Sequence, residues 1–446
     1  MPAVALPRAV LRLRRLGARA AYVVTAQTLY WAAVVWRRAL VGTTFIAVTG
    51  THGKTTTKEM LATILGSRRP TFRASGNENT GLPLTRNVLR VRPWQRFAVI
   101  EIGVGAPGEM RRLARLVRPD LAVILTVQRT HMKAFGDLER HADEKAVLLK
   151  AMGRGGTAVI NADDPRVAAM AGAAPGRVVR SGSSPAFDLW AEGAASRWPE
   201  RLEFDVRTRD RESCHVRTRL VGTHWCASAT AALAAATALG VPLQSAAAAL
   251  AAVEPFLGRM QPVLLPSGAV ILRDDYDGSV DAFAAGLKVL AEARAARRIA
   301  VVADASDYGS TPRRKRVDRL GRESARAADV VVFVGPTAEY GKRGALASGL
   351  APENAHAFAT LSEAAAFLQD TLRPGDVALL KGRVSDHLAR LFFAQLGPVR
   401  CRLAHCGKLI LCDECAELGI APDHRKRAKP VPVERAATDR LAPPAS

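Results

Sequence analysis

Acidic residues, aromatic residues and cysteines are all scarce in this 446-residue sequence. The 41 Asp and Glu residues are outnumbered by 64 Lys and Arg residues, and residues 1–42 contain no acidic residue. Aromatic residues make up only 5% of the chain and are not interleaved with basic residues as in an RNA-binding module. No small-residue cleavage site follows a short apolar core, so the sequence does not indicate a cleavable signal peptide, and we expect a reducing, cytoplasmic compartment.

The excess of basic residues gives a formal net charge of +23. Such a charge suits nucleic acid, an anionic membrane surface or anionic substrates. Because the basic residues are scattered through most of the chain, we interpret the excess mainly as an Arg-rich surface and do not expect a nucleic-acid partner. The hydrophobic content of 48% excludes global disorder, and the length suffices for two or three domains with cores of their own.

The N-terminal segment, residues 1–42, is basic and apolar, and we expect it to be helical. Residues 20–36 carry no charge between Arg19 and Arg37, and seventeen residues is roughly the lower limit for crossing a bilayer. Three polar residues near the middle weaken that interpretation. The alternatives are a helix in peripheral contact with a membrane surface through residues 20–36 and a helix packed on the protein itself.

Residues 45–57 are the most informative stretch of the chain. An apolar run predicts a buried parallel strand, and a helical pattern follows it after two glycines, Gly50 and Gly53. Glycines let backbone N–H groups approach phosphate oxygens, and a helix N-terminus adds positive charge. Lys54 is placed to reach the β- and γ-phosphates of a nucleotide, and the Thr55 hydroxyl suits Mg²⁺. The two glycines are closer together than in the usual phosphate loop.

Apolar runs that alternate with helical patterns predict an α/β fold, with a central phosphate-loop ATPase domain built on a parallel sheet and a C-terminal Rossmann-like domain. Alternating residues between 181 and 222 indicate small antiparallel strands beside the first sheet. Because ligands lie at the carboxyl ends of parallel strands, we expect Glu101 to face the nucleotide. The predicted divisions are a helix segment at 1–42, an ATP-binding domain at 43–260, a C-terminal domain at 261–398, a cysteine-rich element at 399–423 and a disordered tail at 424–446.

Several short motifs follow the phosphate loop in a fixed order. They are Asn77-Glu-Asn-Thr-Gly-Leu-Pro83, Glu101-Ile-Gly103 with Pro107-Gly-Glu109, His131-x3-Phe135-Gly136 with Lys145, Gly222-x-His224, Gly258-Arg-Met260, Asp274-Asp-Tyr276, and Gly375-Asp with Lys381-Gly382. Together with the loop, the series resembles the Mur ligase family over about residues 43–395, closest to the branch that adds D-alanyl-D-alanine to a UDP-muramoyl peptide. The resemblance implies an enzyme that uses ATP to join a carboxylate to an amine through an acyl phosphate.

The resemblance also implies roles for individual residues. Glu101 and His131 become Mg²⁺ ligands beside Thr55, and Lys145 matches a lysine that carries a carbamate derived from CO₂. From the residues alone, Lys145 and Lys381 are also compatible with surface lysines, and His131 with a core histidine. The other implied site residues are Gly50, Thr51, His52, Gly53, Lys54, Thr55 and Thr56 for the ATP phosphates, Arg259 and Asp275 for the nucleotide, and Asn79 and Lys381 for substrate.

The sequence departs from the family where substrates are recognised. Only residues 1–44 precede the first strand, where the family has an N-terminal domain that binds the UDP-sugar. Trp225 and Ser228 replace two asparagines, the family's Asp-Ser-Tyr-Asn-Ala-Asn-Pro becomes residues 274–280, and its Lys-Gly-Ser-Arg becomes residues 381–384. We therefore expect a shortened Mur-type ligase for a peptidoglycan-precursor-like or re-purposed carboxylate, with an amino acid or dipeptide as the amine.

Four of the six cysteines crowd into fifteen residues, as Cys401-x4-Cys406 and Cys412-x2-Cys415. Two closely spaced pairs suit a structural, tetrahedral Zn²⁺ site, although the pairs are closer together than in a usual zinc ribbon. Buried free cysteines and redox-active cysteines are the alternatives. The family motifs do not supply this cluster.

The leading hypothesis is a cytoplasmic ATP-dependent ligase, with association to a membrane as an extension of it. Retention of Lys54, Glu101, His131 and Lys145 favours catalysis over a non-catalytic scaffold that binds ATP on a ligase fold. A basic nucleic-acid-binding ATPase is the second alternative. Steep salt dependence of binding and stimulation by DNA or RNA would support it.

Overall fold

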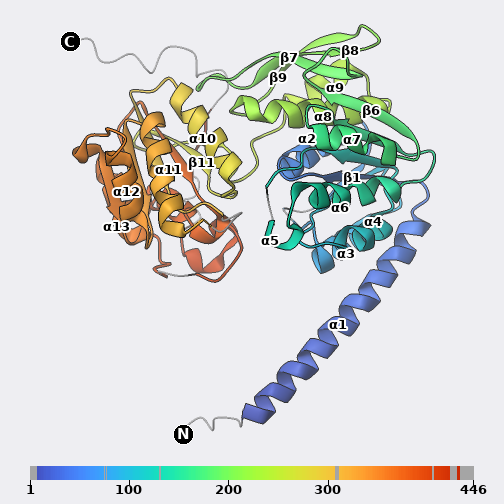
Figure 1. Ribbon diagram of the computed structural model, residues 1–446, viewed down its shortest axis with the longest axis horizontal. Helices are drawn as coiled ribbons and strands as arrows, with labels where there is room; N and C mark the ends of the chain where they lie inside the picture. Colours follow the sequence, from blue (N-terminus) through green and yellow to red (C-terminus); the bar gives the residue numbers. More distant parts are fainter. Residues whose placement is uncertain are drawn as a thin grey trace. The chain divides into compact units, whose positions relative to one another are not determined.

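The computed structural model describes residues 8–74, 76, 78–129, 132–306, 311–403, 406–421 and 429–431, and for residues 8–22, 133 and 429–430 it describes the backbone alone. The chain forms two compact units, coloured mainly blue to green and yellow to red in Figure 1. The first unit comprises Met1–Trp190, Thr208–Asp210 and Thr230–Ala246, and the second comprises Ala191–Arg207, Arg211–Ala229 and Ala247–Ser446.

The helices and strands of the described residues have the following bounds. The strands are β1 Thr44–Thr49, β2 Thr71–Arg73, β3 Phe97–Glu101, β4 Leu121–Ile124, β5 Thr157–Asn161, β6 Arg177–Gly182, β7 Leu189–Ala195, β8 Glu203–Thr208, β9 Ser213–Arg217, β10 Gln261–Leu264, β11 Val270–Asp274, β12 Arg297–Val302, β13 Val330–Val334, β14 Ala355–Phe358, β15 Asp376–Lys381 and β16 Lys429–Pro430. The helices are α1 Arg8–Ala39, α2 Lys54–Gly66, α3 Gly81–Arg90, α4 Glu109–Val117, α5 Met132–Phe135, α6 Leu138–Lys150, α7 Pro165–Ala169, α8 Cys226–Ala238, α9 Leu243–Leu250, α10 Val280–Glu292, α11 Arg313–Ala327, α12 Ala338–Leu346, α13 Leu361–Thr371 and α14 Ala389–Ala394.

The first sheet has the strand order β2-β3-β1-β4-β5-β6-β7-β8-β9. The strands from β2 to β6 pair in parallel, whereas β8 and β9 pair antiparallel, as the change of pattern after residue 181 predicts. The strand β1 is buried on both faces and lies between β3 and β4, with Val48 opposite Glu101. The carboxyl ends of these strands therefore meet at the glycine loop that follows β1.

The second sheet has the order β14-β13-β12-β15-β11-β10-β16. Its strands from β14 to β11 are parallel and alternate with helices α10 to α13 along the chain, so the predicted α/β class with two sheets is confirmed. The expected disordered tail differs in one respect, because Lys429 and Pro430 pair antiparallel with β10. An edge strand leaves backbone N–H and C=O groups unpaired, and this short segment covers some of them. The rest of 424–446 lies outside the described residues.

The C-terminal half of α1 packs on the first unit. Tyr30 and Val34 are buried against the core, and the Arg37 side chain donates to the backbone carbonyls of Val117 and Arg118 at 2.7 and 2.8 Å. These carbonyls end α4, where a cation is favoured by the helix dipole. Of the three alternatives for the N-terminal segment, packing on the protein therefore holds for this half. Within the described part of the chain, no helix has both the length and the hydropathy needed to cross a membrane.

Candidate active site

The glycine loop between β1 and α2 approaches its neighbours closely. A Cβ atom on Gly50 would lie 2.8 Å from the Cβ of Leu125, so a larger residue does not fit there without a shift. Gly53 has a φ of 79°, a left-handed conformation that favours glycine, and it immediately precedes α2. The loop therefore turns tightly into a helix N-terminus, which is the geometry that binds phosphate groups.

The loop is held from inside and from the segment after β4. Lys54 donates from its Nζ atom to the carbonyls of Gly50 and Thr51, at 3.0 and 2.9 Å. The Thr51 hydroxyl accepts from the backbone N–H of Gln128 at 2.9 Å, and the His52 ring bonds to the Gln128 side chain. These bonds fix the loop conformation, and they place an ammonium group at its centre.

Thr55, Glu101 and Asn79 converge beside the loop. The Thr55 hydroxyl donates to one oxygen of the Glu101 carboxylate at 2.9 Å, and the Asn79 amide donates to the other at 2.7 Å. Glu101 is 1% exposed and Thr55 is 3% exposed. A buried carboxylate beside a hydroxyl offers the oxygen ligands that Mg²⁺ prefers. The structure thus brings together three residues that the sequence separates by 46 positions.

Lys145 lies on α6 and is 2% exposed, so it is not the surface lysine that the residues alone allowed. Burial, and secondarily the positive charge of Lys54, lower the pKa of Lys145 to about 7, while Glu144 acts in the opposite direction. Glu144 is engaged elsewhere, because its carboxylate accepts from the N–H groups of Gly108 and Met110 at the start of α4. The amine of Lys145 therefore loses its proton at a lower pH than the amine of an exposed lysine does.

Two further predicted residues, Lys381 and Asp275, are buried in ion pairs. Lys381, at the end of β15, is 0% exposed and bonds to the Asp274 carboxylate at 2.6 Å. It is therefore neither a surface lysine nor, as placed, open to a substrate. Asp275 is 2% exposed and accepts from the Arg273 guanidinium at 3.1 and 3.3 Å. Burial raises the pKa of Asp274, and the nearby Lys381 ammonium partly opposes that shift.

Arg273 and Lys58 are structurally important residues that the sequence analysis missed. Arg273 is buried and also forms a bidentate pair with Asp413, at 2.7 and 2.9 Å. Lys58 is fully buried in α2 and donates to the carbonyls of Ala74 and Gly76 at 2.8 and 2.7 Å, so it holds the segment that leads to Asn79. A lysine one turn after Lys54, on an otherwise apolar helix face, was the available signal.

The remaining predicted residues have clear positions, with one exception. Arg259 pairs with Asp277 at 3.2 Å and lies over the ring of Tyr276. Thr56 is buried at the start of α2. His131, predicted as a metal ligand, lies outside the described residues.

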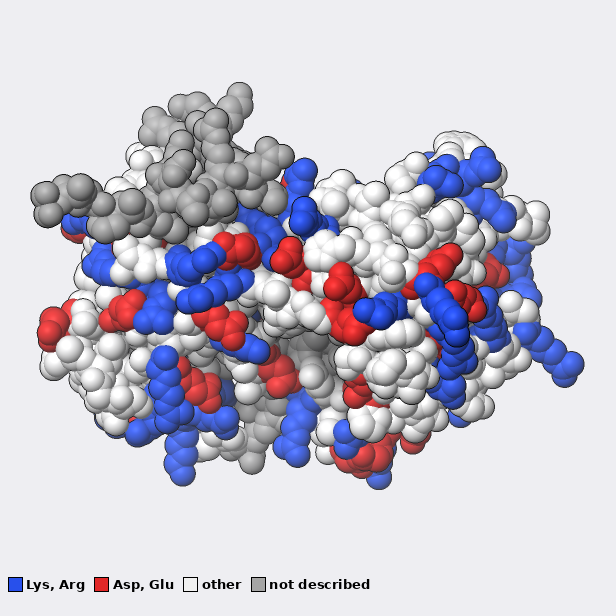
Figure 2. Space-filling view, turned by 90° about the horizontal axis from the view of Figure 1, so that it is seen from above, with Lys and Arg blue, Asp and Glu red and all other residues white. Residues whose placement is uncertain are grey.

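On the face drawn in Figure 2, Lys and Arg side chains are interspersed with Asp and Glu side chains among the coloured residues, and they do not form one continuous basic stripe there.

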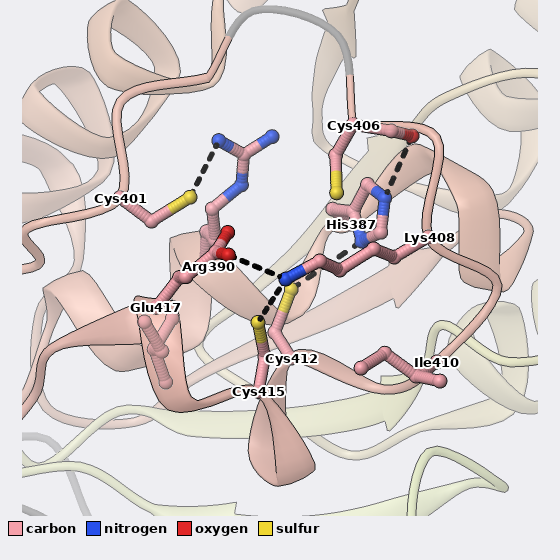
Figure 3. Close-up of a pocket in the computed structure, with 10 residues that line it drawn as sticks. His387, Arg390, Cys401, Cys406, Lys408, Ile410, Cys412, Cys415 and Glu417 are labelled. Carbon is pink, nitrogen blue, oxygen red and sulfur yellow. Dashed lines mark hydrogen bonds and ion pairs between the residues drawn. The ribbon is translucent and has the colours of Figure 1, made fainter. Parts of the chain in front are cut away.

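The four clustered cysteines line one pocket of the second unit, together with His387, Arg390 and Lys408 (Figure 3). All four are free thiols. Burial raises the pKa of Cys412 to about 12. As placed, no three His, Cys, Asp or Glu side chains in the described ranges stand close enough to share a metal ion.

Comparison with known proteins identifies the family. A model of the Mur ligase middle domain matches residues 48–236, and one of the Mur ligase glutamate ligase domain matches residues 258–384. The chain is 32% identical over 374 residues to the UDP-N-acetylmuramoyl-tripeptide–D-alanyl-D-alanine ligase of Mycobacterium tuberculosis, covering 78% of this chain and 73% of that protein.

Solved structures of Mur ligases have the same fold as this chain. A crystal structure of MurF from Acinetobacter baumannii superposes with a TM-score of 0.73 at 28% identity, covering 82% of this chain and 80% of that one. MurF ligase from Thermotoga maritima, solved in complex with ADP, shares the fold with a TM-score of 0.72 at 23% identity, covering 83% of each chain. Because both Mur ligase domains match and a relative shares 32% identity over 73% of its length, the chain belongs to the Mur ligase family.

Proposed function

We propose that this ligase activates a carboxylate with ATP at the loop of residues 50–56 and then joins it to an amine. The observation that carries the proposal is the buried contact of 2.9 Å between the Thr55 hydroxyl and the Glu101 carboxylate, at the point where the loop meets the end of β3. The loop suits phosphate oxygens, and the oxygen pair suits the cation that accompanies ATP.

Thr55 and Glu101 would hold Mg²⁺ through these two oxygens, with His131 as a third ligand implied by the family. Bound there, the ion would supply positive charge to the phosphoryl oxygens. Lys54 supplies a second positive charge beside the loop, and both would stabilise the charge that develops during phosphoryl transfer. Asn79, which donates to Glu101, orients that carboxylate.

We propose that Lys145 carries a carbamate. Its neutral amine attacks the carbon of CO₂ and forms a C–N bond. The electron pair of one C–O π bond moves to oxygen, which gives the carboxylate of the carbamate, and the nitrogen loses a proton to solvent. Only the unprotonated amine reacts, and a pKa of about 7 makes that form available near neutral pH. The product is an anion close to Lys54, so the cation that disfavours a protonated Lys145 would favour its carbamate.

The reaction then has two steps. An oxygen of the substrate carboxylate attacks the γ-phosphorus, and the bond to the β-phosphate oxygen breaks, which gives an acyl phosphate and ADP. The amine attacks the acyl carbon, phosphate leaves, and the nitrogen loses a proton. Because acyl phosphates hydrolyse in water, the site has to exclude solvent while the intermediate exists.

The proposed substrates are a peptidoglycan-precursor-like carboxylate and an amino acid or dipeptide. The relative from M. tuberculosis is named for a UDP-N-acetylmuramoyl-tripeptide and D-alanyl-D-alanine. Two departures from that branch, Gly278 and Arg383, touch each other here, because a Cβ atom on Gly278 would overlap the Cγ atom of Arg383. Paired changes of this kind support an amine pocket with a different shape, and hence a different amine.

The test is phosphate release from ATP and Mg²⁺ across pools of carboxylates and amines, with UDP-muramoyl tripeptide and D-alanyl-D-alanine as one pair. Turnover that requires both a carboxylate and an amine is the expected result. ATP hydrolysis that depends on neither would contradict the proposal and favour a scaffold. Stimulation by DNA or RNA would favour the nucleic-acid alternative.

We also propose that α1 attaches the enzyme to an anionic membrane surface. On a face of α1 that flanks Tyr30 and Val34, about 100° around the helix axis, the side chains of Val24, Trp31 and Val35 are 44–65% exposed. The Arg115 guanidinium lies 5.1 Å from the centre of the Trp31 ring, so this apolar face adjoins a basic hollow. The hollow is lined by Arg38, Arg111, Ala114, Arg115, Arg118, Val147, Lys150 and Ala151. Apolar side chains beside cations match the boundary of an anionic bilayer.

A further inference from the structure

We propose that Cys401, Cys406, Cys412 and Cys415 bind one structural Zn²⁺ ion. Figure 3 shows their sulfur atoms pointing into one pocket, from the segment after α14 on one side and from the 3₁₀ turn Cys412–Glu414 on the other. Four thiolates are the ligand set that structural zinc sites prefer. The site is separate from the ligase chemistry and does not depend on it.

The charges around the pocket suit a zinc–tetrathiolate centre. Binding Zn²⁺ releases four thiol protons to solvent and leaves a centre with a net charge of −2. Arg390 lies 3.8 Å from the sulfur of Cys401, and Lys408 lies 3.8 Å from the sulfur of Cys415. Lys408 is shared with Glu417, at 2.8 Å. The two cations would offset the negative charge of the centre.

His387 lies at the inner wall of the pocket. Its Nδ1 atom is 3.4 Å from the Cys412 sulfur, and its Nε2 atom is 3.3 Å from the Cys406 carbonyl oxygen. The ring thereby links both cysteine pairs to the segment between β15 and α14. Imidazoles and cations next to metal-bound sulfur orient the ligands.

The segment that carries the cysteines has little regular structure to fix it. Between residues 399 and 421, its described secondary structure consists of two 3₁₀ turns of three residues each. Its anchoring in the core depends on Cys412, Leu418 and Ile420. Ordering such a segment costs conformational entropy, and metal binding commonly offsets that cost in small cysteine-rich elements. Since no three ligands are within sharing distance as placed, the segment would close around the ion.

The metal would also position a residue of the polar network in the second unit. Asp413 lies between Cys412 and Cys415 and forms the bidentate pair with Arg273. Arg273 in turn holds Asp275, the residue predicted to contact nucleotide. Fixing the two cysteines therefore fixes Asp413, and through it the end of β11.

The experiment is metal analysis of the full-length protein, purified without chelators under reducing conditions. We expect one zinc per chain, and after exchange with Co²⁺ the sulfur-to-cobalt charge-transfer and visible bands of a tetrahedral thiolate site. Cys412→Ser should lose the metal, whereas Cys214→Ser, on β9 and outside the cluster, should keep it. If Cys412→Ser does not fold, Cys401→His provides the second test, because a Cys₃His site should still bind one zinc.

Two results would overturn the proposal. One is a wild-type protein without zinc that gives no thiolate spectrum with Co²⁺ and has six reactive thiols on denaturation, which would indicate free cysteines. The other is a disulfide within the cluster in a second preparation made without reductant, with free thiols alkylated at lysis, which would indicate redox chemistry.

Discussion

Replacing Lys145 separates its proposed role in catalysis from the energetic cost of burying it. In Lys145→Ala the carbamate cannot form, and we expect turnover to fall on the order of 100-fold or more, as when a preorganised charge in an active site is removed. Phosphate release under saturating ATP measures this loss. Because the variant leaves a cavity beside Lys54, formate or acetate should partly restore turnover by supplying the missing anion.

Replacing Lys145 should lower turnover but should remove a cost to the stability of the folded state. The pKa of Lys145 is lowered from 10.5 to about 7, so the unfolded chain binds a proton that the folded chain does not bind between these values. At about 1.4 kcal/mol per pH unit, the wild-type protein should lose roughly 3 kcal/mol of stability as the pH falls from about 9 to about 7, and its stability should then level off. Lys145→Met should lack this loss.

Urea denaturation in buffer freed of CO₂, at several pH values, measures the difference. Lys315→Met, an exposed lysine on α11, is the control and should follow the wild-type pH dependence. Full activity of Lys145→Ala would refute the carbamate. Equal pH dependence of wild type and Lys145→Met would refute the buried, shifted amine.

Three further changes test other parts of the molecule. Arg273→Met removes the cation that pairs with the buried carboxylate of Asp275 and with the part-buried carboxylate of Asp413, and it should cost about 3–5 kcal/mol of unfolding free energy in urea titrations. An unchanged midpoint would contradict the network. Gly50→Ala places a Cβ against Leu125 and should weaken ATP binding in calorimetry on the order of 10-fold while the fold persists; unchanged affinity would contradict a close phosphate approach. Trp31→Glu should reduce sedimentation of the protein with anionic vesicles, and neither the wild-type protein nor the variant should bind neutral vesicles. Equal binding of the wild-type protein and the variant to anionic vesicles would contradict the membrane proposal.

The parts of the site that the sequence predicted are those encoded by local order. A strand, two glycines and a Lys-Thr pair at the start of a helix define the phosphate loop without knowledge of distant contacts. Glu101 was predictable because it ends a second apolar strand, and carboxyl ends of parallel strands meet at one edge. In the structure, Val48 near the end of β1 lies opposite Glu101 at the end of β3, so the two strands do end side by side.

The parts that the sequence could not predict depend on long-range partners. Arg273 and Asp413 are separated by 140 positions, and neither residue type is expected to be buried without a partner. Lys381 is the last residue of an apolar strand, a position where a lysine is expected to be exposed. It is buried because its ammonium group pairs with Asp274 on the adjacent strand. Burial of a lysine depends on the acid opposite it, and strand order decides which acid that is.

Gly278 and Arg383 show how substrate recognition can change within a preserved frame. Arg383 forms a bidentate pair with Asp386 and lies 3.7 Å from Asp304, so its stem must pass close to the backbone of Gly278. An alanine at 278, as in the family pattern, would occupy the position of that stem, whereas the smaller serine of the family at 383 would leave the space empty. Arg383 therefore requires a glycine at position 278. Gly278→Ala alone should displace Arg383 and change which amine is accepted, and adding Arg383→Ser should relieve the clash. The rate of ATP-dependent phosphate release with each amine, for both variants, would separate this coupling from two independent losses.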